Sequence, residues 1–339
     1  MLLSIFKFRE ALVNKIPANL KFGITAGIGL FITIIALLNA KVIVADPATT
    51  VALGDLGAVP VVLSIVGLII IGALHHYKVK GDILIGILAT WVLGIIAELT
   101  GWYQVNPEAG VFSVIPSFSW ESIKSNFAAP ALFQFDFGFI AKNIAPFAVV
   151  VFTFLYTDIF DTVGTLIGVA QKGDLLDEDG NLPNASGALM ADAVGTVVGA
   201  CLGTSTVTSY VESSAGVVAG GRTGLTALTT AVLFLVAILF APIFLAIPSF
   251  ATTPAMLFVG LLMLSAVKNM EFDGDVADAI GGFLAIVMMP FAYSIATGIM
   301  FGVVSWVVLK LLTGKVKDIS PVMWITVVLF VLYIITQVV

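Results

Sequence analysis

Three acidic residues stand where the surrounding sequence is apolar enough to lie inside a lipid bilayer. Asp158 and Asp161 fall within residues 152–170, FTFLYTDIFDTVGTLIGVA, and Glu212 falls within the string TSTVTSYVESSAGVVAGG. A carboxylate at membrane depth costs about 2.5–3.5 kcal/mol or more, so such a residue is expected to bind a substrate, an ion or a proton. These residue types therefore indicate movement of a small solute across a membrane.

The spacing of Asp158 and Asp161 places the two carboxylates on one face of a helix, about one turn apart. Two carboxylates this close in a low dielectric do not both ionise readily, so one of them is expected to hold a proton at neutral pH. Such a group is a natural proton carrier. The alternative is that Thr157, Thr162, Thr165 and backbone groups satisfy both acids in a packed interior, without any transport role.

A broken segment is expected around Glu212. The stretch from Thr204 to Val211 is rich in β-branched residues and favours an extended backbone, whereas Ser213 is a good N-cap for the short helix of small residues that follows. An extended stretch near 204–212 that runs into a half-helix would present backbone amides at mid-membrane depth. The competing interpretation is a Ser/Thr-rich loop outside the membrane.

The composition of the chain supports a membrane location. Its 339 residues are 60% hydrophobic and 11% charged, with a mean hydropathy of +1.13, whereas soluble domains carry roughly a quarter charged residues. The net charge of −6 and the lack of a basic, aromatic-rich patch argue against nucleic acid as a partner. A single His-His pair is too little for a metal site, and no cofactor is predicted. No cleavable signal peptide is evident in residues 1–19.

Apolar runs that can cross the roughly 30 Å hydrocarbon core recur along the whole chain. They lie near residues 20–39, 59–75, 82–99, 144–170, 187–203, 223–248, 254–267, 279–312 and 320–338. The run 279–312 is too long for one pass, and Pro290 is expected to break it. With the broken stretch 204–221 included, the sequence predicts an all-α polytopic membrane protein with about ten transmembrane segments.

Positive residues set the expected orientation, because cytoplasmic connections carry an excess of Lys and Arg. They form three clusters: Lys7, Arg9, Lys15 and Lys21; His75, His76, Lys78 and Lys80; and Lys310, Lys315 and Lys317. Placing all three clusters in the cytoplasm puts the N-terminus inside and the connection 100–143 outside.

Four stretches of the sequence resemble one known family. FTFLYTDIFDTVGTLIGVA, TSTVTSYVESSAGVVAGGRTGLTAL, LFVGLLMLSAVKNMEFDG and IVMMPFAYSIATGIMFG look like the nucleobase cation symporter-2 (xanthine/uracil permease) family and, within it, the AzgA-like guanine/hypoxanthine/adenine permeases. The resemblance covers essentially the whole chain, and the string of the type TSxTxYVESxAG is highly specific.

The resemblance implies a fold and a function. The fold is fourteen spans in two inverted seven-span repeats, divided into a core that carries substrate and a gate that closes around it. The function is proton-coupled uptake of a purine nucleobase (hypoxanthine, guanine or adenine) by alternating access, with no enzymatic activity.

The resemblance also implies roles for single residues. By motif, Asp158 resembles the acid that binds the purine, and Asp161 resembles the residue that couples transport to the proton. Glu212 resembles a second acid that binds the substrate, and the backbone amides of Val211 and Ser213 are implied to contribute to the same contact. The resemblance also admits a homodimer.

Family members begin with about four further spans, so the chain is expected to hold spans five to fourteen and to be N-terminally truncated relative to them. Residues 1–143 then form gate-type helices of the first repeat plus an external connection. Residues 144–250 form core-type helices with the substrate motifs, and residues 251–339 form gate-type helices of the second repeat.

Two other functions compete with transport. One is a non-transporting membrane fragment or an interaction partner of such a permease, suggested by the missing spans. The more remote one is an intramembrane aspartyl protease, in which two acids share a proton and activate water. A protease requires acids on two facing helices, whereas Asp158 and Asp161 share one helix.

Overall fold

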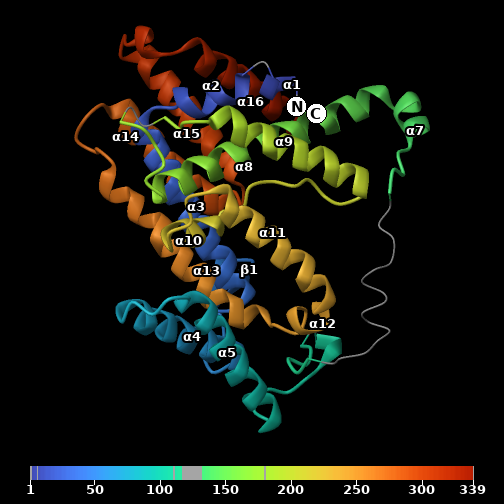
Figure 1. Cartoon of the computed structure of the whole chain (residues 1–339). Coiled ribbons are helices and arrows are strands. Elements are labelled where there is room, and N and C mark those ends of the chain that lie inside the picture. The colour runs from blue at the N-terminus through green and yellow to red at the C-terminus, as the bar shows by residue number, and fades with distance from the viewer. Residues whose placement is uncertain (1, 6, 110, 117–131, 179–180, 339) are drawn as a thin grey trace. The chain divides into compact units, whose positions relative to one another are not determined.

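The computed structural model describes residues 2–5, 7–109, 111–116, 132–178 and 181–338, and these residues are mostly helical (Figure 1). Within this described part, seven helices are long and apolar enough to cross a membrane: Ala18–Asn39, Val59–His76, Asp82–Leu99, Pro146–Lys172, Ala185–Leu202, Ser249–Asn269 and Ile295–Leu312. Shorter apolar helices cover Gly224–Leu239, Val276–Phe291 and Pro321–Ile335. The predicted all-α polytopic membrane fold is confirmed.

The chain divides into two compact units. The first unit comprises Met1–Phe31, Ala129–Val217 and Leu262–Val339, and the second comprises Ile32–Ala128 and Val218–Leu261. Two helices, α3 (Ala18–Asn39) and α13 (Ser249–Leu264), contribute residues to both units.

The first unit contains the segments in which the sequence places its acidic residues. Its other helices are α1 (Leu2–Ile5), α2 (Phe8–Lys15), α7 (Phe137–Lys142), α8 (Ile144–Lys172), α9 (Ala185–Leu202), α10 (Ser213–Val218), α14 (Val276–Phe291), α15 (Ile295–Leu312) and α16 (Pro321–Val338), with the 3-10 turns η2 (Ser265–Asn269) and η3 (Val316–Asp318). The short helix α2 packs on α8, α9 and α16, and α8 packs on α15 and α16 (Figure 1).

The long apolar run near the C-terminus is broken close to the predicted position. Helix α14 ends at Phe291, directly after Pro290, and α15 begins at Ile295 with the Ser294 hydroxyl accepting a hydrogen bond from the Thr297 amide at 3.2 Å. Helix α14 continues through Pro290, and the break follows in a turn where Tyr293 adopts a left-handed backbone with φ of +52° and the Ser294 amide donates to the Met289 carbonyl at 3.1 Å. The two halves fold back on each other in close contact, since a Cβ at Gly302 would lie 2.9 Å from the carbonyl oxygen of Gly281.

A charged cluster ties the start of α14 to the end of α15. The Asp275 carboxylate caps α14 by accepting the Ala277 amide at 2.8 Å, and it accepts hydrogen bonds from the ammonium groups of Lys310 and Lys315, each at 2.7 Å. These two lysines, followed by the Ala277 amide, hold the pKa of Asp275 well below its usual range. The cluster therefore fastens the two helices together most strongly when Asp275 is ionised.

We expect Asp275→Asn to destabilise the protein by about 1–3 kcal/mol at pH 7, because the substitution weakens hydrogen bonds to two charged groups. The folded-state pKa is lowered, so the stabilisation is present above the unfolded pKa of about 4 and is lost as the pH falls through the folded-state value. Thermal unfolding of the purified protein should show a gap between wild type and variant that narrows below about pH 4. A gap independent of pH, or one equal to that of Asp273→Asn in the neighbouring turn, would contradict this role.

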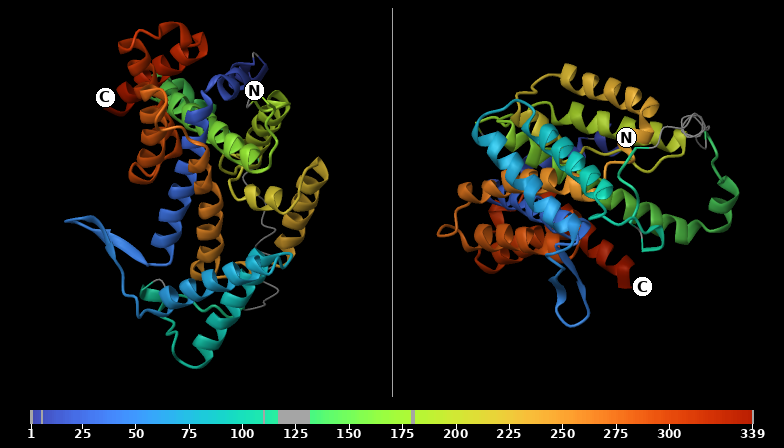
Figure 2. Two further views of the ribbon diagram at one scale, coloured as in Figure 1. Left: turned by 90° about the vertical axis from the view of Figure 1, so that its left-hand side faces the viewer. Right: turned by 90° about the horizontal axis from the view of Figure 1, so that it is seen from below.

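The second unit consists of helices around a small apolar core and one exposed hairpin. It contains β1 (Ile43–Asp46), β2 (Thr50–Leu53), α4 (Val59–His76), α5 (Asp82–Leu99), the 3-10 turn η1 (Pro107–Ala109), α11 (Gly224–Leu239) and α12 (Ala241–Phe244). The two strands pair antiparallel, with Ile43 opposite Leu53 and Asp46 opposite Thr50, and the hairpin projects away from α4 and α5 (Figure 2).

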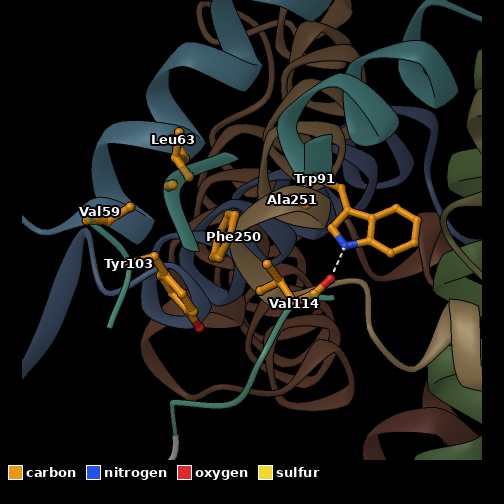
Figure 3. Packing of buried hydrophobic residues seen from close by; sticks show 8 residues of the cluster. Val59, Leu63, Trp91, Tyr103, Val114, Phe250 and Ala251 are labelled. Atoms are coloured by element: carbon orange, nitrogen blue, oxygen red, sulfur yellow. Dashed lines mark hydrogen bonds between the residues drawn. The ribbon is translucent and has the colours of Figure 1, made fainter. Parts of the chain in front are cut away.

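Aromatic residues fill the core of the second unit, where α4, α5 and α13 meet the connection after α5 (Figure 3). The members are Val59, Leu63, Trp91, Ala97, Tyr103, Val114, Phe250 and Ala251. The indole N–H of Trp91 donates to the Val114 carbonyl at 2.8 Å, and the Ser64 hydroxyl donates to the Phe250 carbonyl at 3.1 Å. The polar groups that enter this core are thus paired, as burial requires.

Candidate functional site

Helix α8 carries both predicted aspartates, but the two carboxylates have different neighbours. Asp158 is half-buried; its Oδ1 accepts a hydrogen bond from the Thr206 hydroxyl at 2.8 Å, and its Oδ2 lies 3.8 Å from an Arg9 guanidinium nitrogen. Asp161, also half-buried, lies beside the backbone N–H of Ala296 at the start of α15. The aspartates remain within electrostatic reach of each other, yet they link α8 to different parts of the first unit.

The helical structure is interrupted near 204–212 as predicted: residues 204–210, which we call the extended stretch, are followed by a turn at 211–212. Helix α9 ends at Leu202 and is followed by Gly203, whose φ of +75° is accessible to glycine at little cost; residues 204–210 then form neither helix nor strand. This stretch runs back along α9, where the Thr196 hydroxyl donates to the Val207 carbonyl at 2.8 Å. Gly199 permits the close approach, because a Cβ there would lie 2.8 Å from the Val207 side chain.

Glu212 sits in the turn that joins this stretch to α10. Its side chain is exposed and makes no hydrogen bond or ion pair with any residue that the structure describes. The Val211 side chain is buried, and the Ser213 amide already donates to the Tyr210 carbonyl at 3.2 Å. The structure therefore places Glu212, Val211 and Ser213 in one turn, with the Glu212 side chain exposed and the Val211 side chain buried.

The structure adds an acid that the sequence interpretation missed. Asp192 on α9 is buried, and its Oδ2 accepts a hydrogen bond from Arg9 Nη2 at 2.8 Å. Both of its oxygens lie 3.2 Å from the Thr162 hydroxyl, which is itself 3.0 Å from the Thr208 hydroxyl. Asp192 thereby joins α2, α8, α9 and the extended stretch in one set of polar contacts.

We call this set the polar cluster. It consists of Arg9, Asp158, Thr162, Asp192, Thr206 and Thr208. Two carboxylates and one guanidinium leave it with one uncompensated negative charge when all three groups are ionised. Such a site favours a proton or a neutral solute with N–H donors over an anion.

One signal in the sequence pointed to Asp192, whereas none pointed to the role of Arg9. Asp192 is an acid within the apolar run 187–203, which is the same signal that drew attention to Asp158. Arg9 was interpreted only as one of the positive residues that set orientation, whereas its side chain is 4% exposed and lies between two acids. Among the residues that the structure describes, no group of three or more His, Cys, Asp or Glu side chains is placed to hold a metal ion.

Comparison with known proteins places the chain in a family. The model of the Permease family (Xan_ur_permease) matches residues 1–301. The chain is 39% identical to the adenine permease AdeP of Escherichia coli over 99% of this chain and 71% of that protein. It is 39% identical to the guanine/hypoxanthine permease PbuG of Bacillus subtilis over 98% of this chain and 72% of that protein.

A third relative agrees with these two. The chain is 41% identical to the guanine/hypoxanthine permease PbuO of Bacillus subtilis, over 97% of this chain and 73% of that protein. The resemblance inferred from the motifs is thus confirmed by matches across nearly the whole chain. This protein belongs to the xanthine/uracil permease family.

Proposed function

We propose that the chain takes up a purine nucleobase (hypoxanthine, guanine or adenine) by proton-coupled secondary active transport. The names of its relatives, which are adenine and guanine/hypoxanthine permeases, support this substrate class. The observation that carries the proposal is the placement of Asp158 on a membrane-spanning helix, facing the extended stretch and 16% exposed. An acid at membrane depth that is partly exposed is expected to lie on a substrate, ion or proton pathway.

The two proposed substrate acids suit a planar heterocycle. A purine presents N–H donors along its edges, and a carboxylate is an acceptor that can pair with them. We assign Asp158 to one such edge and Glu212 to another, with Val211 and Ser213 completing the contact. Because the Ser213 amide already donates to the Tyr210 carbonyl, we assign the Ser213 contact to its hydroxyl.

Asp161 is proposed to couple transport to the proton. Its carboxylate lies beside the Ala296 amide in the first turn of α15, an 18-residue helix. A helix N-terminus attracts an anion through its unpaired amides and its dipole. Protonation of Asp161 would weaken this attraction. Proton binding on α8 would therefore loosen the contact between α8 and the N-terminus of α15.

Alternating access is proposed to arise from movement of core-type residues 144–250 against the gate-type residues 1–143 and 251–339. We place the N-terminus in the cytoplasm because of the three positive clusters. We also propose that lipid surrounds the apolar helices and that the protein assembles as a homodimer.

The protease alternative finds no support in the polar cluster. Two acids that share a proton must face each other directly, whereas an Arg9 nitrogen lies 2.8 Å from Asp192 and 3.8 Å from Asp158.

Uptake in cells that lack their own purine permeases tests the proposed function. Cells expressing the 339-residue chain would be given radiolabelled hypoxanthine, guanine or adenine, with uracil as a control and with or without a proton uncoupler. Uptake of at least one purine that the uncoupler abolishes is expected. Absence of purine uptake, with the protein confirmed in the membrane, would favour the non-transporting alternative.

We expect Glu212→Gln to reduce purine uptake by about tenfold, because it weakens one hydrogen bond to a charged acceptor, worth about 1.5 kcal/mol. Initial uptake rates at several purine concentrations would measure the loss. The matched control is Glu178→Gln, which makes the same change at an exposed residue in the turn after α8. Equal rates for Glu212→Gln and Glu178→Gln would remove Glu212 from the substrate site.

A further inference from the structure

We propose that Asp192 is a positioning residue, which holds the guanidinium of Arg9 away from Asp158 so that Asp158 stays available to the purine. This inference rests on the proposed function, because it takes Asp158 as the substrate acid. The interaction behind it is a competition between the carboxylates of Asp158 and Asp192 for the buried guanidinium of Arg9. That competition can also be measured without a substrate.

The geometry shows which carboxylate holds the cation. Arg9 Nη2 is 2.8 Å from Asp192 Oδ2, a hydrogen-bonded ion pair, and the same nitrogen is 3.8 Å from Asp158 Oδ2. The Arg9 side chain is 4% exposed and that of Asp192 is 1% exposed, whereas 16% of the Asp158 side chain is exposed. The buried pair is therefore Arg9 with Asp192, and Asp158 is the acid that faces outward from it.

The threonines of the cluster explain this preference. If Thr208 donates to Thr162, the Thr162 hydroxyl is free to donate to Asp192, so that Asp192 accepts hydrogen bonds from both Thr162 and Arg9. Asp158 is held from the other side by Thr206, which donates to its Oδ1. Each carboxylate is thus fixed by its own hydroxyl, and the side chain of Arg9 is fixed on Asp192.

Loss of the charge on Asp192 would change the partner of Arg9. A buried guanidinium without a carboxylate is strongly unfavourable, and the nearby Asp158 Oδ2 is only about 1 Å beyond hydrogen-bonding distance. Arg9 would then pair with Asp158 and occupy the acceptor that a purine N–H requires. Arg9 therefore acts as an internal competitor of the substrate, and Asp192 keeps it from competing.

A rescue experiment tests this competition. Binding of radiolabelled purine would be measured on the purified full-length chain for wild type, Asp192→Asn and the double variant Arg9→Gln/Asp192→Asn, with Asp273→Asn as a control at an exposed turn. We expect Asp192→Asn to weaken binding by about tenfold or more, and the double variant to regain affinity within about threefold of wild type. Thermal unfolding of the same proteins separates this role from a merely structural one. A structural role predicts that purine affinity falls and recovers together with stability, whereas the competition predicts weaker binding in Asp192→Asn that is still folded.

Several outcomes would overturn the inference. One is wild-type affinity in Asp192→Asn; another is a double variant that is folded, as judged by its thermal unfolding, but binds no better than Asp192→Asn. If Asp192→Asn fails to fold, the double variant is still informative, because it contains no buried unpaired guanidinium. Asp192→Glu provides a second check, since it keeps the partner of Arg9 and should retain binding.

A chemical readout separates this inference from the proposed function. A hydrophobic carbodiimide modifies carboxyl groups in apolar surroundings, and mass spectrometry of the peptide containing Asp158 would quantify its modification. We expect less modification of Asp158 in Asp192→Asn than in wild type, and recovery in the double variant. If wild type binds no purine but this labelling pattern appears, the substrate assignment fails and the Arg9 competition stands; equal labelling in all three proteins would overturn the competition.

Discussion

Asp158→Asn is expected to reduce purine uptake by about 100-fold or more while the protein still reaches the membrane. The substitution removes the charge of the proposed substrate acid and exchanges one acceptor oxygen for a donor group. Charge-assisted hydrogen bonds contribute about 1.5–3 kcal/mol each, so the loss of one or two of them accounts for an effect of this size. The measurement is the initial rate of radiolabelled purine uptake, normalised to the amount of protein in the membrane.

The control for Asp158→Asn is the same chemical change at an exposed site, Asp273→Asn, which should leave uptake unchanged. Asparagine at position 158 still offers an oxygen to Thr206, whose hydroxyl donates to Asp158 Oδ1 at 2.8 Å, so the contact with the extended stretch is retained. A large loss of uptake with normal thermal unfolding would therefore come from the substrate contact. Uptake within threefold of wild type would reject Asp158 as the substrate acid.

Most of the fold was predictable from the sequence because each element depends on local signals. The helices follow from apolar runs of spanning length, the break between α14 and α15 from the excessive length of the run 279–312, and the stretch 204–210 from its β-branched residues. The helices α11 and α12 divide a run that was expected as one segment, 223–248, and Pro242 lies at the division. The same helix-breaking rule applied to that proline would have predicted it.

The polar cluster was only partly predictable. Asp158 could be identified from the sequence as a candidate site residue, because an acid in a membrane-spanning run is costly whichever elements pack against that run. The pairing of Arg9 with Asp192 depends on two residues 183 positions apart, and local signals give no information on that contact. From the sequence, the charge of Arg9 is equally compatible with a cytoplasmic residue that sets orientation and with a partner of buried acids. Only the packing of α2 against α8 and α9 distinguishes these two roles.

The separation of Asp158 from Asp161 also required the structure. Spacing alone places two carboxylates one turn apart, which is compatible with a single shared site. The structure instead gives Asp158 the hydroxyl of Thr206 and gives Asp161 the amide of Ala296. Two acids with different partners can have different tasks, one toward the extended stretch and the other toward α15.

Asp161→Asn is expected to abolish accumulation of purine against its gradient while leaving exchange of purine across the membrane. Asparagine keeps an oxygen that can accept the Ala296 amide, but it cannot bind and release a proton. A gradient of about 150 mV is worth about 3.5 kcal/mol per proton. With one proton per purine, this supports about 300-fold accumulation, because each 1.4 kcal/mol corresponds to tenfold. The variant should equilibrate its substrate to a ratio of about one, which is also the result expected for wild type with an uncoupler.

Two assays on the same membranes distinguish proton coupling from substrate binding at Asp161. Net accumulation under an imposed proton gradient reports coupling, and exchange of labelled for unlabelled purine without a gradient reports binding and the movement of the loaded carrier. Loss of both activities in Asp161→Asn, with retained proton dependence in Asp158→Asn, would show that the two roles are reversed. Accumulation that persists in Asp161→Asn and is still abolished by an uncoupler would assign the coupling proton to another group. The carboxylates of Asp158 and Asp192 around Arg9 are then the next candidates, because both lie within 3.8 Å of one guanidinium nitrogen.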